Sequence, residues 1–322
     1  MDLLAQIFTA TTLAIILTKV TPLLLAAIGG AFTQQANVLN IGLEGMMLIG
    51  AFASISVGAA AGSPLVGVLA GIGAGLLLAL IYAGASLWLK ADNIVVGIGV
   101  NLLALGMSVF VLQVLYGTPG ATPPDVTVTL PPVPLGPLAS VPFIGEVLGR
   151  QTIIVYLAFL IVPLFAFVLY RTSFGVHLRA VGEDPGAAAA AGIGINKMKF
   201  WSILISGVLC GLAGAQLAMA SLGVFSANMT AGRGFIALAA LTFGLARPVR
   251  TMVAALIFGS ADAIADQLGV AGVNSNLALM TPYIITILAL VLVAIRVQTA
   301  VRLRRSAALK DLQAVSAAGG AS

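Results

Sequence analysis

Residues 64–89 read PLVGVLAGIGAGLLLALIYAGASLWL and contain no charged side chain. A helix that crosses the apolar core of a membrane needs roughly 20 such residues, so this stretch predicts a membrane span. Glycines recur at four-residue spacing here and again later in the chain: Gly67, Gly71, Gly75, and Gly207, Gly211. Small residues at this spacing let membrane helices approach closely, so the pattern predicts tight helix packing and says nothing about a substrate.

The whole chain has the composition of a membrane protein. Of its 322 residues, 60% are hydrophobic and only 8% are charged, and the mean hydropathy is +1.14. Soluble domains carry about 25% charged residues. Cys210 is the single cysteine and His177 the single histidine, which excludes a disulfide framework and metal sites built on pairs of either residue. The sequence has no G-x-x-x-x-G-K-[ST] motif, so we expect no ATP site on this chain, no bound metal and no catalytic residue.

Nine apolar stretches predict an all-α polytopic membrane bundle of about 8–10 spans. They are 4–31, 38–60, 64–89, 93–116, 152–170, 201–222, 230–246, 249–268 and 279–296. Lys19 and Pro22 predict that the first helix is broken or strongly tilted. The stretches 38–60 and 230–246 are rich in glycine and polar residues. They predict broken or re-entrant helices, which persist at membrane depth only where protein covers them.

The basic residues predict the orientation of the chain. Most of them lie in short loops, in the segment 171–200 and toward the C-terminal tail 301–322, and the positive-inside rule places these regions in the cytoplasm. One crossing per apolar stretch then puts the N-terminus outside. The proline-rich loop 117–150 also falls outside; it has no helical period, and we interpret it as an extended external loop or a cap. The net charge of +5 is not arranged as a basic stripe interleaved with aromatic residues, so we expect no nucleic-acid partner.

Two parts of the sequence are weakly similar. Residues 40–51 precede a Ser63-Pro64 turn and a glycine-rich span, and residues 232–240 precede an Arg247-Pro248 turn and another span. Similar pieces in the same order predict two related halves that meet at a central pathway, as is common in transporters.

Glu44 is the most informative single residue. A charge at membrane depth costs at least ~2.5 kcal/mol on insertion scales, so such a side chain normally faces the bundle interior or an aqueous cavity. Asn40 lies four positions earlier, and on a helix both side chains would share one face. The pair either lines a translocation pathway or makes a structural hydrogen bond between helices, with Asn101 or Gln216 as the expected partner.

Three further polar residues are candidates for the pathway. Asn101 lies inside a strongly apolar stretch, where its amide needs a partner or water, and Asn228 and Arg233 precede the second half-helix. The alternatives for the last two are helix capping and snorkelling of the side chain to the interface. Asp262 and Asp266 lie four residues apart near the end of a span, and we interpret them as a solvated helix end.

The segment 171–200 contains a short helix with clear end signals. Asp184 is a plausible N-cap, Pro185 suits the first helical position, and the alanines at 187–191 favour a helix that Gly192 ends. A capped and nearly uncharged helix between two spans predicts a surface that a partner protein grips; the alternative is a plain amphipathic connector.

These residues make the chain recognisable. Residues 38–51 read VLNIGLEGMMLIGA, and residues 179–185 read RAVGEDP. Both resemble the permease subunits of bacterial ATP-binding-cassette (ABC) importers for branched-chain amino acids, simple sugars and nucleosides. The NIGLEG block looks most like the nucleoside-type permeases. The resemblance runs from about Pro22 to Ala294 and implies a single permease domain over 1–300.

The resemblance also implies partners and a location in the bacterial inner membrane. A separate ATP-binding-cassette subunit would carry ATP and Mg²⁺, a second permease, expected to be a different polypeptide, would complete the pathway, and a binding protein or lipoprotein would deliver substrate outside. The capped helix would be the coupling helix docked on the ATPase, so that this chain is a transport subunit and not an enzyme. The implied coupling residues are Glu183, Asp184, Pro185, Gly186, Ala189 and Gly192.

Other functions remain open at this point. Glu44 could serve as the cation site of an ion-coupled transporter, and an intramembrane enzyme would need a nucleophile–base pair that the sequence does not offer. Among importer substrates, nucleosides are favoured over simple sugars and branched-chain amino acids. For a nucleoside, Phe225 and Phe235 would offer stacking surfaces near Asn228.

Overall fold

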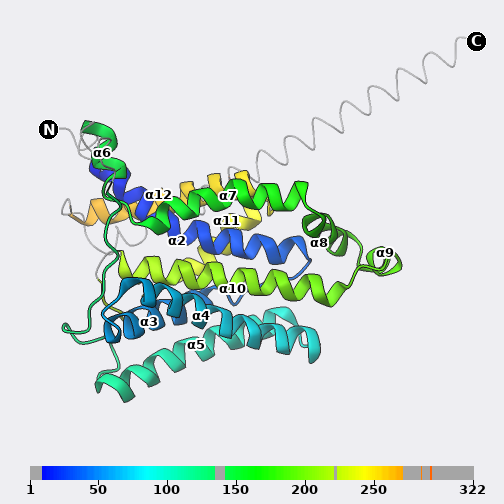
Figure 1. The fold of residues 1–322 in the computed structure, drawn as a ribbon, viewed down its shortest axis with the longest axis horizontal. Coiled ribbons are helices and arrows are strands. Elements are labelled where there is room, and N and C mark those ends of the chain that lie inside the picture. The colour runs from blue at the N-terminus through cyan, green and yellow to red at the C-terminus, as the bar shows by residue number, and fades with distance from the viewer. Residues whose placement is uncertain (1–8, 135–141, 221–222, 271–283, 285–290, 292–322) are drawn as a thin grey trace, which may run out of the picture. The chain divides into compact units, whose positions relative to one another are not determined.

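The computed structural model describes residues 9–134, 142–220 and 223–270, together with residues 284 and 291 (Figure 1). Its contacts divide the chain into a compact unit that ends at Ile264 and a second unit from Ala265 onward. The features discussed below lie in the first unit. The predicted single domain over 1–300 stays a prediction.

Seven described helices are long and apolar enough to cross a membrane. They are α2 (Ala10–Gln35), α3 (Leu43–Ala60), α4 (Pro64–Ala83) with its π-helical extension η1 (Gly84–Trp88), α5 (Asn93–Tyr116), α7 (Ile153–Arg171), α10 (Ile195–Met219) and α12 (Pro248–Val270). Four shorter helices connect them: α6 (Pro142–Leu148), α8 (Ser173–Glu183), α9 (Pro185–Ala190) and α11 (Arg233–Phe243). Within the described residues, β pairing amounts to two isolated bridges. The predicted all-α polytopic fold is confirmed.

Three of the nine expected spans differ from the prediction or lie outside the described residues. The stretch 230–246 forms only the 11-residue helix α11, and at 1.5 Å per residue this is about 16 Å, half of an apolar core. The stretch 279–296 lies outside the described residues apart from two positions. The expected break in the first span is absent, because α2 continues through Pro22. Helix α2 is buried from Val20 to Phe32, and packing on all sides keeps it helical across the proline.

Helices α2, α3 and α10 form the inside of the bundle, whereas α4, α5 and α7 expose most of their residues. The predicted glycine packing joins α4 to α10. A Cβ atom added to Gly75 would lie 2.8 Å from the Cα of Gly211, and one added to Gly207 would lie 2.8 Å from the carbonyl oxygen of Gly75. Any larger residue would push these two helices apart, so the prediction from spacing is confirmed.

Helices α8 and α9 lie at one end of the bundle, and α6 lies at the other (Figure 1). We call these the α9 end and the α6 end. Helix α6 corrects the expectation of a wholly extended 117–150 loop. It is held in place where Tyr156 donates its hydroxyl hydrogen to the carbonyl of Leu148 at 2.7 Å. A helix of two turns among prolines carries too little periodicity to be found from sequence.

Candidate functional site

Helix α3 begins inside the bundle and is capped by another helix. The chain leaves α2 at Gln35 and runs without helical structure to Gly42. Gly42 is the N-cap of α3, and because glycine has no side chain it offers no acceptor to the first amides of the helix. Asn101 of α5 supplies the missing acceptor. Its Oδ1 accepts a hydrogen bond from the Gly45 amide at 2.8 Å, and its Nδ2 donates to the Ile41 carbonyl at 3.0 Å. The amide of Asn101 therefore satisfies backbone groups that a helix end leaves unpaired.

Helix α11 also begins without a side-chain cap of its own. Its N-cap, Gly232, has φ of +83°. Glu44, in the first turn of α3, caps it instead: Oε1 accepts from the Gly232 amide at 2.8 Å, and Oε2 accepts from the Gly234 amide at 2.5 Å. Gly234 has to be glycine, because a Cβ atom there would lie 2.5 Å from the backbone nitrogen and Cα of Glu44.

The N-termini of α3 and α11 thus meet at Glu44. From this point α3 runs toward the α6 end, where Gly58 approaches Val128. Helix α11 runs toward the α9 end, where Gln35 Nε2 donates to the Ala246 carbonyl at 2.9 Å. The two segments that the sequence predicted as related therefore contain helices of 18 and 11 residues, which run in opposite directions from N-termini that meet at Glu44.

The contact between the two helix N-termini explains how the Glu44 carboxylate is tolerated inside the membrane-spanning bundle. Glu44 is only 8% exposed, but both of its oxygens accept backbone hydrogen bonds. The N-terminus of a helix carries about half a positive elementary charge, and Glu44 lies at two such termini. The partners are the backbone of α11, and neither Asn101 nor Gln216, which corrects the expected pairing. Gln216 instead accepts from Thr152 at 2.7 Å.

A pocket of about 370 Å³ opens beside this meeting point. Glu44, Asn101 and Asn228 line it, together with Phe235 and several aliphatic side chains of α3 and α5. Asn228 is exposed and has φ of +57°, and Phe235 is 48% exposed. Three of the five predicted pathway residues therefore come together, although they are far apart in the sequence. Their role in transport stays a prediction.

Asn40 lies elsewhere, because α3 starts three residues after it. The expected shared helix face with Glu44 is wrong. Asn40 is 1% exposed; its Nδ2 donates to Ser206 Oγ at 3.1 Å, and its Oδ1 accepts from the Gly42 amide at 2.9 Å. It fixes the turn before α3 against α10.

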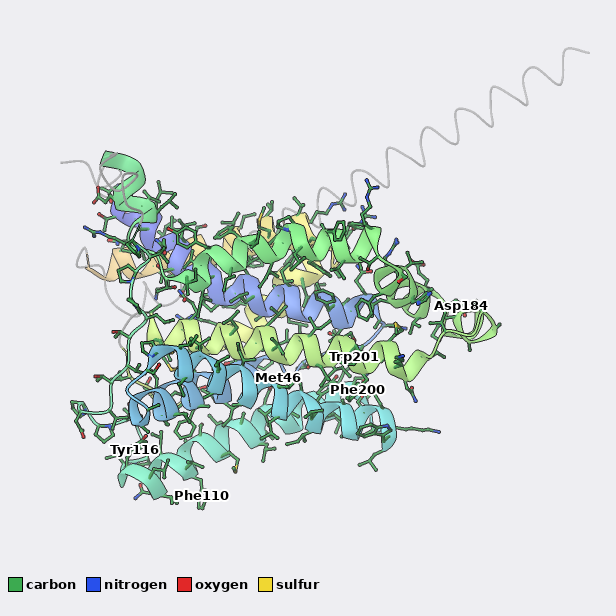
Figure 2. All side chains as sticks on the ribbon, viewed as in Figure 1. Met46, Phe110, Tyr116, Asp184, Phe200 and Trp201 are labelled. Carbon is green, nitrogen blue, oxygen red and sulfur yellow. The ribbon has the colours of Figure 1, made fainter. Side chains whose placement is uncertain are left out.

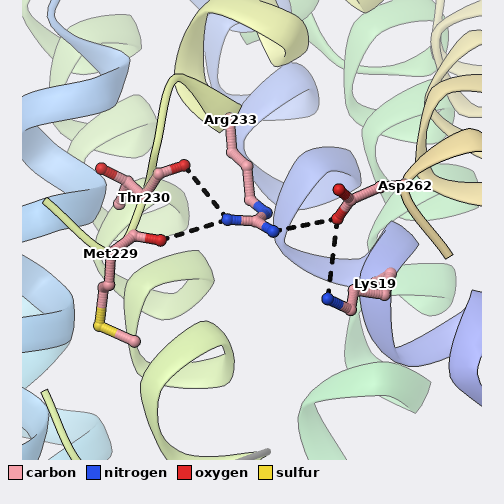
Figure 3. A network of polar contacts seen from close by, with 5 residues as sticks. All are labelled: Lys19, Met229, Thr230, Arg233 and Asp262. Atoms are coloured by element: carbon pink, nitrogen blue, oxygen red, sulfur yellow. Dashed lines mark hydrogen bonds and ion pairs between the residues drawn. The ribbon is translucent and has the colours of Figure 1, made fainter. Parts of the chain in front are cut away.

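Arg233 does not line the pocket, and its side chain lies in a polar network instead (Figure 3). Its Nη2 lies 3.1 Å from Asp262 Oδ2, and Lys19 Nζ lies 3.9 Å from the same oxygen. Asp262 is therefore an ion-paired residue with 17% of its side chain exposed, which corrects the interpretation as a solvated helix end. The side chain of Asp266 lies outside the described residues.

Arg233 also stabilises the turn that precedes α11. Its Nη1 donates to the carbonyls of Met229 and Thr230 at 3.2 and 3.4 Å. This turn contains Ala231 with φ of +45°, a backbone conformation that costs a non-glycine residue of order 1 kcal/mol. The guanidinium thus holds a strained turn and links it to α12.

The predicted short helix at the α9 end is confirmed as α9. Asp184 caps it by accepting from the amides of Gly186 and Ala187 at 2.8 and 3.0 Å. Gly192, with φ of +77°, ends it: the Gly192 amide donates to the Ala189 carbonyl and the Ile193 amide to the Ala188 carbonyl, the pattern of a Schellman motif. Figure 2 shows Asp184 at the tip of the α9 end.

Most of α9 is exposed, and only Ala188 is buried. Glu183 is exposed and is the last residue of α8. Helix α8 was missed by the sequence analysis. The signal was present: Thr172 caps it by accepting from the Gly175 amide at 3.2 Å, and Leu178 and Val181 at three-residue spacing form its buried face.

The sequence matches a known family of transport proteins. Residues 12–294 match the family described as branched-chain amino acid transport system / permease component. The chain belongs to this permease family. It is 38% identical to the guanosine ABC transporter permease NupQ of Bacillus subtilis, over 84% of this chain and 87% of that protein.

Two further relatives are named for different substrates. The nucleoside ABC transporter permease NupC of Lactococcus lactis is 38% identical over 84% of this chain and 88% of its own length. The putative glucose ABC transporter permease TsgC13 of Haloferax volcanii is also 38% identical, over 76% of this chain and 73% of its own. No solved structure matches this chain.

The permease family decides the class of the protein. The chain is a multi-pass membrane protein and a transport subunit of an ABC transporter, and not an enzyme. ATP hydrolysis belongs to a separate ATPase subunit, and a substrate-binding partner is implied. Of the three classes of protein that the sequence allowed, the family match therefore supports the ATP-driven importer, and not the ion-coupled transporter or the intramembrane enzyme.

Proposed function

We propose that this permease carries nucleosides inward across the bacterial inner membrane by alternating access. The observation that supports this most is the pocket at the meeting point of α3 and α11, where two helix N-termini, two amide side chains and an aromatic ring surround one cavity. Two relatives named for nucleosides or guanosine, each similar over more than four fifths of this chain, favour the same substrate class.

The chemistry of the pocket suits a nucleoside. Most of its wall is aliphatic, and the half-exposed ring of Phe235 offers a stacking surface for a base. The exposed amide of Asn228 offers a donor and an acceptor to ribose hydroxyls or base edges. Phe225, the other aromatic candidate, is fully buried and packs edge-on against Phe52 at 5.2 Å, so it takes no part in stacking on a substrate.

The proposed partners are those that the permease family implies, and the exposed α9 end supports one of them. The ATPase subunit, which binds ATP and Mg²⁺, docks on the exposed faces of α9 and the end of α8, and this chain binds no cofactor. Rigid-body movement of α9 then rocks the spans between outward- and inward-facing states. A second permease chain completes the pathway, and an extracytoplasmic binding protein or lipoprotein delivers the substrate. The docking residues are Glu183, Asp184, Pro185, Gly186, Ala189 and Gly192.

Uptake of labelled guanosine, glucose and leucine tests the substrate class. Cells that lack the native transporters receive this chain with its partner subunits, and uptake is measured while ATP and the proton gradient are varied independently. We expect ATP-dependent guanosine uptake that unlabelled uridine or adenosine inhibits and that glucose leaves unchanged. Uptake of glucose or leucine without guanosine would refute the nucleoside proposal.

A pocket variant tests the location of the site. Phe235→Ala should raise the KM for guanosine at least about fivefold, because stacking a base on an aromatic ring is worth about 1–3 kcal/mol. Phe110→Ala is the matched control, since Phe110 of α5 is 63% exposed and does not line the pocket. Equal KM values for the two variants would place the substrate elsewhere.

A further inference from the structure

A second cavity lies outside the proposed pathway, between α7 and α10. It measures about 430 Å³, and all nine side chains that line it are apolar. Helix α2 contacts both α7 and α10, and Phe32 of α2 contributes to the lining. Leu164 of α7 and Trp201 of α10 line it while remaining about half exposed (55% and 48%). The cavity is therefore a groove that opens to the surroundings of the bundle.

The lining decides what kind of molecule the groove can hold. It offers no hydrogen-bond partner apart from the indole nitrogen of Trp201, and burying a hydroxyl or amide without a partner is unfavourable. A nucleoside or sugar, with several such groups, is excluded. A hydrocarbon chain has no polar group that would lose a hydrogen bond in this groove. The groove also lies between two membrane-spanning helices, which lipid acyl chains surround.

Basic residues continue both walls of the groove toward the α9 end. On α10, Lys197 precedes Trp201 by four residues, so it extends the same helix face by one turn. On α7, Arg171 follows the lining residue Val168 by three residues. Both basic residues are exposed, and neither makes an ion pair with any residue that the structure describes. Two cations thus stand one turn beyond an apolar groove.

We propose that this groove is a binding site for an anionic phospholipid. One acyl chain lies in the groove against Trp201, and the headgroup phosphate lies between Arg171 and Lys197. Tryptophan is common at the level of the headgroups, and Figure 2 shows Trp201 on the α9-end half of α10. The positive-inside rule assigns this end to the cytoplasmic leaflet, whose anionic lipids attract basic residues next to spans. The site is independent of the transported substrate.

Quenching of tryptophan fluorescence by brominated lipids tests the site. Trp88 and Trp201 are the two tryptophans of the chain, so Trp88→Phe leaves a single reporter in the groove. The full chain is reconstituted in nanodiscs that contain either dibrominated phosphatidylglycerol or dibrominated phosphatidylcholine, diluted in unbrominated phosphatidylcholine. The ratio of the two association constants at Trp201 measures the preference for the anionic lipid.

A matched control reports the ordinary lipid around the bundle. Leu77 of α4 is 60% exposed and lines none of the described pockets named above. The variant Leu77→Trp, in a background of Trp88→Phe and Trp201→Phe, should therefore show a ratio near 1. At Trp201 we expect a ratio of roughly 25, since each of the two basic residues near an anionic surface contributes a factor of about five.

Removing the cations separates charge from shape. Arg171→Gln with Lys197→Gln should bring the ratio at Trp201 close to 1 while phosphatidylcholine still quenches. A ratio near 1 with both cations present would overturn the proposal. Protection of Trp201 from both brominated lipids, with the Leu77→Trp reporter still quenched, would also overturn it, because a protein segment would then cover the groove.

Discussion

Removing the carboxylate of Glu44 should separate the two helix ends that it joins. In Glu44→Ala the amides of Gly232 and Gly234 lose their acceptors at 2.8 and 2.5 Å, in a place where the lost side chain was 8% exposed. A hydrogen bond to a charged group contributes about 1.5–3 kcal/mol, so we expect the free energy of unfolding to fall by about 3–6 kcal/mol. Glu44→Gln keeps one carbonyl oxygen and should lose about half as much.

The measurement is the thermal unfolding midpoint of the purified chain in detergent. One kcal/mol lowers the Tm of a domain of 150–250 residues by about 2–4 °C, so Glu44→Ala should lower it by roughly 6 °C or more. Glu183→Ala is the matched control, because Glu183 is exposed and accepts no hydrogen bond among the described residues. Its Tm should stay within about 2 °C of the unmodified chain. Equal Tm values for the two alanine variants would refute the argument that Glu44 caps α11.

Four further predictions test neighbouring contacts. Gly234→Ala should lower the Tm and abolish uptake, because its Cβ would overlap the backbone of Glu44; an unchanged Tm would contradict the close approach. Asn101→Ala should lower the stability by about 1–2 kcal/mol, as expected for a lost helix cap, whereas Asn101→Asp keeps the acceptor for α3 and should lose less in the same unfolding assay. Arg233→Met and Asp262→Met should each cost about 1–3 kcal/mol, and the double variant should cost less than the sum; additive losses in a double-mutant cycle would argue against the ion pair. Asp184→Ala should lower the Tm little, because the lost cap lets only the exposed helix α9 unwind, but it should reduce the substrate-stimulated ATPase activity of the reconstituted transporter; full stimulation would argue against coupling through α9.

The features that the sequence predicts well are those that residues close together in the sequence determine. The apolar stretches are long enough to fix most of the spans, because in lipid a helix of about 20 residues must satisfy its own backbone. The cap at Asp184, the end at Gly192 and the glycine faces of α4 and α10 follow for the same reason: each is set by residues within one or two turns. The resemblance to ABC permeases also depends on local motifs and is confirmed by the family match.

Tertiary structure alone decided how the candidate residues are used. Glu44 was visible in the sequence as a charge that needs a partner, but its partners are backbone amides 188 and 190 residues away, and a backbone amide has no sequence signature. Asn40 was misplaced because the first turn of α3 starts only at Leu43, where Asn101 from another helix caps it. Asp262 has the sequence pattern of a solvated helix end, but Arg233 forms an ion pair with it. In each case the free energy of folding depends on a contact between segments that are far apart in the sequence. Apolar patterning and helix propensity do not encode such contacts.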